Sequence, residues 1–240
     1  MCTSAGRTEW PATIDALVAA EQELVAARPN PWLPPGGAVA VAGCFVCAQR
    51  GSVGPGAAGD LVWAGAALLD DRGGARVAVV AGRAPASYVP GFLALRDGPL
   101  LEVAVRQLPA DPAVLLVNAT GRDHPRRVGL AMHLGARLGI PTIGVTARPL
   151  VARGDPPGDE GGAQSPLRID GDVVGCWLRP KPGARPIAVH PGWRTDLETA
   201  VAVVTATTRA ARTPEPLRLA RRAAREARAA YGERAAVMTT

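Results

Sequence analysis

The stretch Ala38-Val-Ala-Val-Ala-Gly-Cys-Phe-Val-Cys47 carries no charged side chain and lies between two segments rich in Gly and Pro. Such a short apolar run is typical of a buried β-strand. Two further apolar runs follow at 61–69 and 76–81, and the turn sequence Asp70-Asp-Arg-Gly-Gly74 joins them. Because consecutive strands with short links pair side by side, these runs predict an antiparallel meander.

After the meander the pattern changes to an alternation of strands and helices, which predicts parallel neighbours in the sheet. The segment 148–166 is rich in Gly, Pro and acidic residues and is expected to form a loop. We therefore expect an α/β fold, with one mixed sheet and helices on both faces. A single domain is expected over residues 1–240, with a core at about 12–216 and a basic C-terminal helix at 217–240. The expected helices are 13–27, 92–107, 124–138, 195–211 and 214–231, and the further strands are 113–117, 142–145, 173–178 and 186–190.

Composition narrows the class of protein. A hydrophobic content of 48% in 240 residues is ample for a buried core. No apolar run reaches the length of about 18 residues that a membrane span needs, and no signal segment is recognisable. We therefore expect a cytoplasmic protein without a membrane partner. Four cysteines are too few for a disulfide scaffold in a chain of this length.

The net charge of +6 is concentrated at one end of the chain. From position 209 to 240 there are eight Arg and three Glu, so that +5 lies there and +1 is spread over the rest. One interpretation is a solvated Ala/Arg helix. The other is a nucleic-acid contact made through the basic C-terminal tail.

Two segments resemble a known family. Ser87-Tyr-Val-Pro-Gly-Phe-Leu-Ala-Leu-Arg-Asp97 and His124-Pro-Arg-Arg-Val-Gly-Leu-Ala-Met-His-Leu-Gly135 are similar to the signature blocks of endonuclease V, which nicks beside deoxyinosine. The resemblance extends from about residue 22 to about residue 216. It implies an RNase H-like fold, in agreement with a meander followed by an α/β half.

The resemblance also implies a divalent metal held by carboxylates on adjacent strands, because Mg²⁺ prefers charged oxygen ligands. At the three corresponding positions this sequence has Phe45, Asp97 and Asn118, and Trp193 stands where the family has a histidine. One carboxylate of three remains. We therefore expect no metal and no other cofactor.

The residues around that cleft suggest a different chemistry. Alternate strand residues share a face, so Cys47 is expected beside Phe45, and the resemblance places Asn118, His124 and Asp97 around the same cleft. A thiol activated by His124, with Asp97 orienting the imidazole and Asn118 stabilising an oxyanion, is a candidate catalytic group. The alternative is that Cys47 is a small buried hydrophobe.

A substrate site is expected next to this group. By resemblance, Tyr88-Val89-Pro90 is a wedge that enters a duplex beside a flipped base. The other candidate substrate-binding residues are Gly121, Phe45 and Trp193. In the alternative interpretation Pro90 simply starts a helix, Tyr88 packs beneath it, and Arg126 and Arg127 are surface charges.

Three functions follow. The first is metal-independent, thiol-based acyl transfer, cyclisation or hydrolysis on a small-molecule or carrier-bound substrate. The second is binding of inosine-containing nucleic acid without catalysis, or with little. The third is an ordinary inosine-specific endonuclease. The sequence favours the first because the carboxylate set is incomplete.

Overall fold

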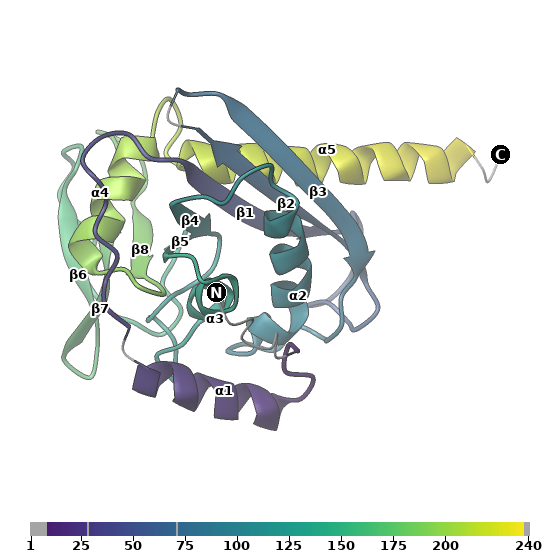
Figure 1. Ribbon diagram of the computed structural model, residues 1–240, viewed down its shortest axis with the longest axis horizontal. Coiled ribbons are helices and arrows are strands. Elements are labelled where there is room, and N and C mark those ends of the chain that lie inside the picture. Colours follow the sequence, from purple (N-terminus) through teal and green to yellow (C-terminus); the bar gives the residue numbers. More distant parts are fainter. Residues whose placement is uncertain (1–8, 28, 71, 238–240) are drawn as a thin grey trace, which may run out of the picture.

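A computed structural model describes residues 9–27, 29–70 and 72–237, and the side chains up to residue 232. Its centre is one eight-stranded mixed sheet with the strand order β3-β2-β1-β4-β5-β8-β7-β6 (Figure 1). The meander is confirmed, since β1 (Val41–Ala48), β2 (Leu61–Leu69) and β3 (Ala75–Arg83) pair antiparallel in sequence order. The parallel half is confirmed as well, because β4 (Val114–Val117) runs parallel to β1 and to β5 (Thr142–Thr146).

The sheet continues past β5 through three antiparallel strands, β8 (Ile187–Pro191), β7 (Asp172–Leu178) and β6 (Gln164–Ile169). Strand β6 lies partly in the segment that the sequence predicts as a loop, so this prediction was wrong there. The strand is at the edge of the sheet, contains Pro166 and buries only Leu167. Edge strands of this kind carry little apolar signal, which explains the error.

Helices cover both faces of the sheet, as expected. One apolar cluster joins α1 (Ile14–Ala27), α2 (Leu93–Arg106) and α3 (Leu130–Leu138) to one face. The opposite face is covered by α4 (Leu197–Thr207) and α5 (Glu215–Val237). Figure 1 shows α2 and α5 on opposite sides of β1 and β2, and the last turns of α5 extend beyond the sheet. Among the described residues, no helix is both long and apolar enough to cross a membrane.

Helix α3 begins at Leu130, six residues later than the sequence predicts. The preceding residues form turns instead, because Arg127 has a φ of +63° and Gly129 N donates to Gly121 O. A helix cannot pass through a left-handed residue. The late start leaves the segment from Asn118 to Gly129 as an ordered loop at the end of β4.

Helix α5 lies very close to β1 and β2, the first two strands of the meander. A Cβ atom on Gly43 would stand 2.5 Å from Leu217 N, and one on Gly65 would stand 2.4 Å from Ala220 O. These two glycines therefore permit direct contact between the helix backbone and the strands. The alternation along β1 sends Gly43, Phe45 and Cys47 to this helix-covered face.

Candidate functional site

A pocket of about 210 Å³ opens at the carboxyl ends of the parallel strands β4 and β5. This is the edge at which open α/β sheets bind their ligands. The walls come from α1, from the turn before α2, from the loop after β4 and from the loop after β5. The lining residues are Glu21, Tyr88, Gly91, Leu93, Ala94, Asn118, Ala119, Thr120, His124, Val128, Leu130, Thr146, Arg148, Pro149 and Leu150.

The turn at 88–91 forms one rim of the pocket, and two side chains hold it from below. Gly91 has a φ of +79°, and its carbonyl oxygen lies 3.0 Å from His124 Nε2 and accepts a hydrogen bond from Arg126 Nη2 at 2.8 Å. Tyr88 N donates to Gly56 O at 2.9 Å, while the Tyr88 side chain remains exposed. The rim is thus rigid in its backbone and presents an aromatic ring outward.

Beneath this rim lies a buried ion pair that joins α1 to the loop after β4. Glu21 is 1% exposed, and both of its oxygens accept hydrogen bonds from the Arg126 guanidinium. Burial raises the pKa of Glu21, but His133, whose Nε2 lies 3.7 Å from Glu21 Oε1, and the hydrogen bonds from Arg126 outweigh this effect, so the net pKa is lowered. Arg126 is therefore a structural partner of the pocket and not a surface charge.

His124 is buried and neutral in this arrangement. Burial lowers its pKa, and the nearby Glu21 and the Gly91 carbonyl only partly oppose that effect. Nδ1 accepts a hydrogen bond from Arg126 N at 3.3 Å, which leaves Nε2 as the protonated nitrogen that donates to Gly91 O. Both ring nitrogens of His124 are thus engaged in hydrogen bonds, Nε2 with the rim turn at Gly91 and Nδ1 with the backbone of Arg126.

A second buried carboxylate, Asp123, holds the opposite wall. Its two oxygens accept hydrogen bonds from the backbone N–H groups of Leu150, Val151 and Ala152 at 2.6, 2.9 and 2.7 Å. The loop so anchored supplies Arg148, Pro149 and Leu150 to the pocket. Behind it lies His190, fully buried, whose pKa is lowered because burial outweighs the attraction of Asp123.

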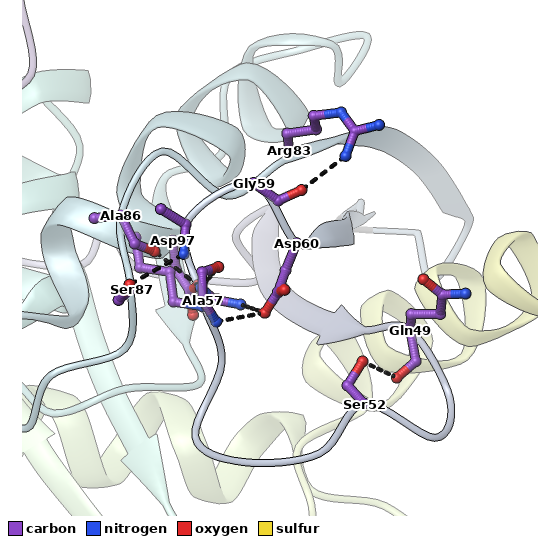
Figure 2. A network of polar contacts seen from close by, with 11 residues as sticks. Gln49, Ser52, Ala57, Gly59, Asp60, Arg83, Ala86, Ser87 and Asp97 are labelled. Carbon is purple, nitrogen blue, oxygen red and sulfur yellow. Dashed lines mark hydrogen bonds and ion pairs between the residues drawn. The ribbon is translucent and has the colours of Figure 1, made fainter.

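Asp97 belongs to a different cluster, on α2. Its neighbour Arg96 is 5% exposed, ion-pairs with Asp60 at 2.9 Å and donates to the carbonyls of Ala57 and Ala86. Figure 2 shows Asp97 within this cluster, near Ala57 and Asp60. Burial raises the pKa of Asp97 to about 6, and Arg96, at 4.0 Å, offsets this only in part.

Phe45 and Asn118 lie where α5 crosses the ends of β1 and β4. The guanidinium carbons of Arg221 and Arg225 stand 4.9 and 5.9 Å from the centroid of the Phe45 ring. Asn118 is exposed, and its Oδ1 accepts a hydrogen bond from Arg221 Nη2 at 3.2 Å. Two of the three positions that the resemblance assigns to metal ligands, Phe45 and Asn118, are thus in contact with Arg221.

The structure does not bring Cys47 and Asp97 together with His124 into the predicted thiol-based catalytic site. Cys47 pairs with Trp63 across β1 and β2 and lies on the face covered by α5, whereas His124 lines the pocket with Asn118. Burial raises the pKa of Cys47 more than the nearby Arg228 and Arg225 lower it, so the thiol stays protonated at neutral pH. His124 has its ring bonded to Gly91 and Arg126, and Asp97 does not orient it.

The remaining predicted residues divide between the pocket and its surroundings. Tyr88 and Gly91 line the pocket, and the exposed Val89 lies between them on the rim turn. Pro90 is also exposed there. Gly121 packs under the loop, where a Cβ would stand 2.1 Å from Pro191 O, and Trp193 lines a separate small cavity of about 30 Å³.

Glu21, Asp123 and Arg126 hold the walls of this candidate site, and the sequence alone did not identify them in that role. Their partners lie far along the chain, 105 residues away for the pair of Glu21 and Arg126. An acidic residue in a strand-to-helix loop, such as Asp123, is the only local signal. That signal does not predict which loop will donate hydrogen bonds to the carboxylate.

Comparison with known proteins identifies the family. The sequence profile of Endonuclease V matches residues 53–222. The Endonuclease V of Streptomyces avermitilis is 37% identical over 233 residues, which are 92% of this chain and 96% of that protein. The Endonuclease V of Methanopyrus kandleri is 46% identical over 142 residues, which are 59% of this chain and 61% of that protein. The latter match therefore spans about three fifths of the relative.

Solved structures agree. The crystal structure of the Streptomyces avermitilis Endonuclease V superposes with a TM-score of 0.81 at 36% identity, covering 91% of this chain and 94% of that one. A Ciona intestinalis Endonuclease V, solved in complex with a 24mer DNA containing an inosine, has a TM-score of 0.73 at 20% identity over 89% of this chain and 96% of that one. The latter shows the shared fold alone.

These relatives also correct the functional prediction. Proteins 37–46% identical to this chain carry the name Endonuclease V, and nothing in them indicates thiol-based acyl transfer, cyclisation or hydrolysis. The prediction of a repurposed, metal-independent thiol chemistry was therefore wrong. The RNase H-like fold and the family inferred from the two sequence blocks are confirmed. The chain belongs to the endonuclease V family.

Proposed function

We propose that this protein acts on inosine-containing nucleic acid as an endonuclease V, with the inosine base held in the pocket at the ends of β4 and β5. The observation that carries the proposal is the pocket itself, with its rigid aromatic rim. Membership of the endonuclease V family supports the choice of a nucleic-acid partner and of this reaction type. The cytoplasmic location expected from the sequence stays a prediction.

The pocket suits a single flipped base. It is a concave site of about 210 Å³, and apolar groups such as Leu93, Val128 and Leu130 line much of it. A few polar groups are fixed around them, which is the usual composition of a small-ligand site. Enzymes that act at a base must take it out of the stack, and a pocket of this kind receives it.

Tyr88 is placed to assist that extrusion. Its ring is 37% exposed at the rim, and its backbone is fixed through Gly56 O and, three residues on, through the two donors to Gly91 O. An exposed ring on a rigid turn loses little entropy when it enters a base stack. We infer that Tyr88 fills the space that the inosine leaves.

The residues present do not fit a Mg²⁺ site of the type that the family resemblance implies. Asp97 is the single carboxylate of the three positions, Asn118 is a neutral amide, and Phe45 offers no donor. Arg221 also lies against both Phe45 and Asn118, where its charge repels a cation. Within the described residues, no group of three or more His, Cys, Asp or Glu side chains is placed to hold a metal ion. We derive no hydrolytic step through a metal and expect incision to be slow.

The test uses two labelled single strands that differ only in one position, deoxyinosine or deoxyadenosine. Selective binding of the deoxyinosine strand is expected, with incision confined to that strand when the protein is in excess and Mg²⁺ or Mn²⁺ is present. Tyr88→Ala is expected to weaken the selective binding about tenfold, and Tyr88→Phe to retain it, because the ring is what stacks. Equal binding of both strands overturns the proposal. Selective binding without any incision overturns the nuclease assignment.

A further inference from the structure

Helix α5 carries a row of three arginines whose charges have no acidic partner. Arg221, Arg225 and Arg228 follow one another at helical spacings of four and three residues, so they share a face. The ion pairs of this helix belong instead to Arg218 with Glu215 and to Arg222 with Glu226. Among the side chains that the structure describes, no carboxylate pairs with the row.

The row is held against the sheet by groups that leave its charge unneutralised. Arg221 and Arg225 stack over the Phe45 ring, and Arg228 Nη1 donates to Ala48 O at 3.0 Å. The Nε atoms of Arg221 and Arg228 are buried and make no hydrogen bond. Burial, together with the nearby Arg225 and Arg212, lowers the pKa of Arg221. Crowded cations that have no carboxylate partner are stabilised by an anion.

The row begins at the mouth of the pocket. Asn118 lines the pocket and accepts a hydrogen bond from Arg221, so a ligand group that leaves the pocket past Asn118 meets Arg221 first. From Arg221 to Arg228 the helix rises about 10 Å, at roughly 1.5 Å per residue. Phosphates of one DNA strand advance by about 3.4 Å per nucleotide along the duplex axis. The row is thus long enough to contact more than one phosphate of the strand.

We propose that Arg221, Arg225 and Arg228 form a phosphate-binding row that holds the nucleic-acid backbone beside the pocket, without a divalent cation in the contact. This inference rests on the proposed function, because it takes the ligand to be the strand whose base enters the pocket. Guanidinium groups suit the task because their planar donors match phosphate oxygens. The row occupies the place where the family resemblance implies a metal, and it neutralises the backbone with side-chain charge.

The experiment measures binding of the deoxyinosine strand by fluorescence anisotropy at several salt concentrations, once in EDTA and once in Mg²⁺. The wild-type affinity in EDTA is expected to stay within about twofold of that in Mg²⁺. Arg221→Gln, Arg225→Gln and Arg228→Gln are each expected to weaken binding and to reduce the salt slope by about 0.7, the loss of one phosphate contact to a single strand. The corresponding Arg→Lys variants are expected to keep the slope.

Arg222→Gln is the matched control. It removes the same charge from the same helix, but Arg222 is exposed and pairs with Glu226, so its salt slope is expected to equal that of the wild type. An equal loss of slope in this variant would overturn the proposal, because it would show a diffuse helix charge. An unchanged slope in the three row variants, or binding that requires Mg²⁺, would overturn it as well. Displacement of the strand by poly-glutamate at equal charge would assign the row to acidic polypeptides instead.

The two proposals fail in different ways. A wild-type protein that binds the deoxyinosine and deoxyadenosine strands equally contradicts the function proposed for the pocket, while the salt slopes still test the row. Selective binding of the deoxyinosine strand, with the same salt slope in the row variants as in the wild type, contradicts only the proposal for the arginine row. Since phosphate contacts carry no base information, the row variants are expected to weaken both strands by the same factor.

Discussion

Arg221 stacks on Phe45, with its guanidinium carbon 4.9 Å from the centroid of the ring, at the position in β1 where the family resemblance implies a metal-binding carboxylate. A cation–π contact of this kind stabilises the positive charge of the arginine, and it does so where a metal would need negative charge. The pair therefore gives the surface next to the pocket a positive charge.

The first prediction restores the carboxylates. In the double variant Phe45→Asp, Asn118→Asp, two carboxylates stand beside Arg221 and supply oxygen ligands of the kind that Mg²⁺ prefers, while Asp97 stays in its own cluster on α2. We expect Mg²⁺ to raise the melting temperature of this variant but not that of the wild type. We also expect incision of the deoxyinosine strand to rise by at least about a hundredfold. Phe45→Leu, Asn118→Leu is the control, and an equal response there would contradict the prediction.

The second prediction concerns the pH dependence of stability through Asp97. Its pKa in the folded protein, about 6, lies above the ordinary value of 3.8, so the fold favours the protonated acid. The resulting penalty is absent below about pH 4, grows as the pH rises and is complete above pH 6. Asp97→Asn is therefore expected to stabilise the protein by about 3 kcal/mol at pH 7.5 and by nothing at pH 4. Urea unfolding at both pH values measures this. Asp170→Asn, at an exposed position, provides the comparison, and a pH-independent difference at Asp97 would refute the assignment.

The third prediction concerns Asp123. Its carboxylate accepts three backbone N–H groups, and an asparagine would turn an amide N–H₂ toward at least one of them. Asp123→Asn is expected to lower the free energy of unfolding by about 3 kcal/mol, because a buried donor is then left without an acceptor. Selective binding of the deoxyinosine strand is expected to fall too, since the anchored loop is a wall of the pocket. Denaturant unfolding and anisotropy test both effects, and the exposed Asp155→Asn change should leave both unaltered.

The fourth prediction is a double-mutant cycle on Glu21 and Arg126. Arg126→Gln leaves the buried Glu21 carboxylate without its ion-pair partner and is expected to cost about 3 kcal/mol, whereas Glu21→Gln leaves the Arg126 side chain, which is 29% exposed, and is expected to cost less. The double variant is expected to lose much less than the sum of the two. The same cycle on the exposed pair of Arg222 and Glu226 should give a coupling below about 0.5 kcal/mol. Additive losses at Glu21 and Arg126 would show that the two act independently.

Much of the fold could be predicted from the sequence, because long apolar runs and short turns are local signals. The three strands of the meander and the parallel pair β4 and β5 are where those signals place them. Strand β6 was missed because an edge strand buries few side chains. The start of α3 was misplaced because a left-handed residue at Arg127 leaves no trace in hydrophobic periodicity.

The candidate site was predictable only in part. Tyr88, Asn118 and His124 line the pocket, and they stand in or beside the segments that resemble the family. The alternation along β1 correctly puts Phe45 and Cys47 on one face, but period alone does not say which layer covers that face. Helix α5 covers it, and the thiol is consequently separated from His124.

Gly43 and Gly65 determine where the arginine side chains of α5 lie relative to the sheet. Because neither has a side chain, they set the height at which α5 rests on the sheet, and hence how far the guanidinium groups of Arg221 and Arg225 stand above Phe45. A methyl group at either glycine would lift the helix and shift both arginines together. The spacing between the pocket and the proposed phosphate-binding row is thus adjustable by residues that belong to neither.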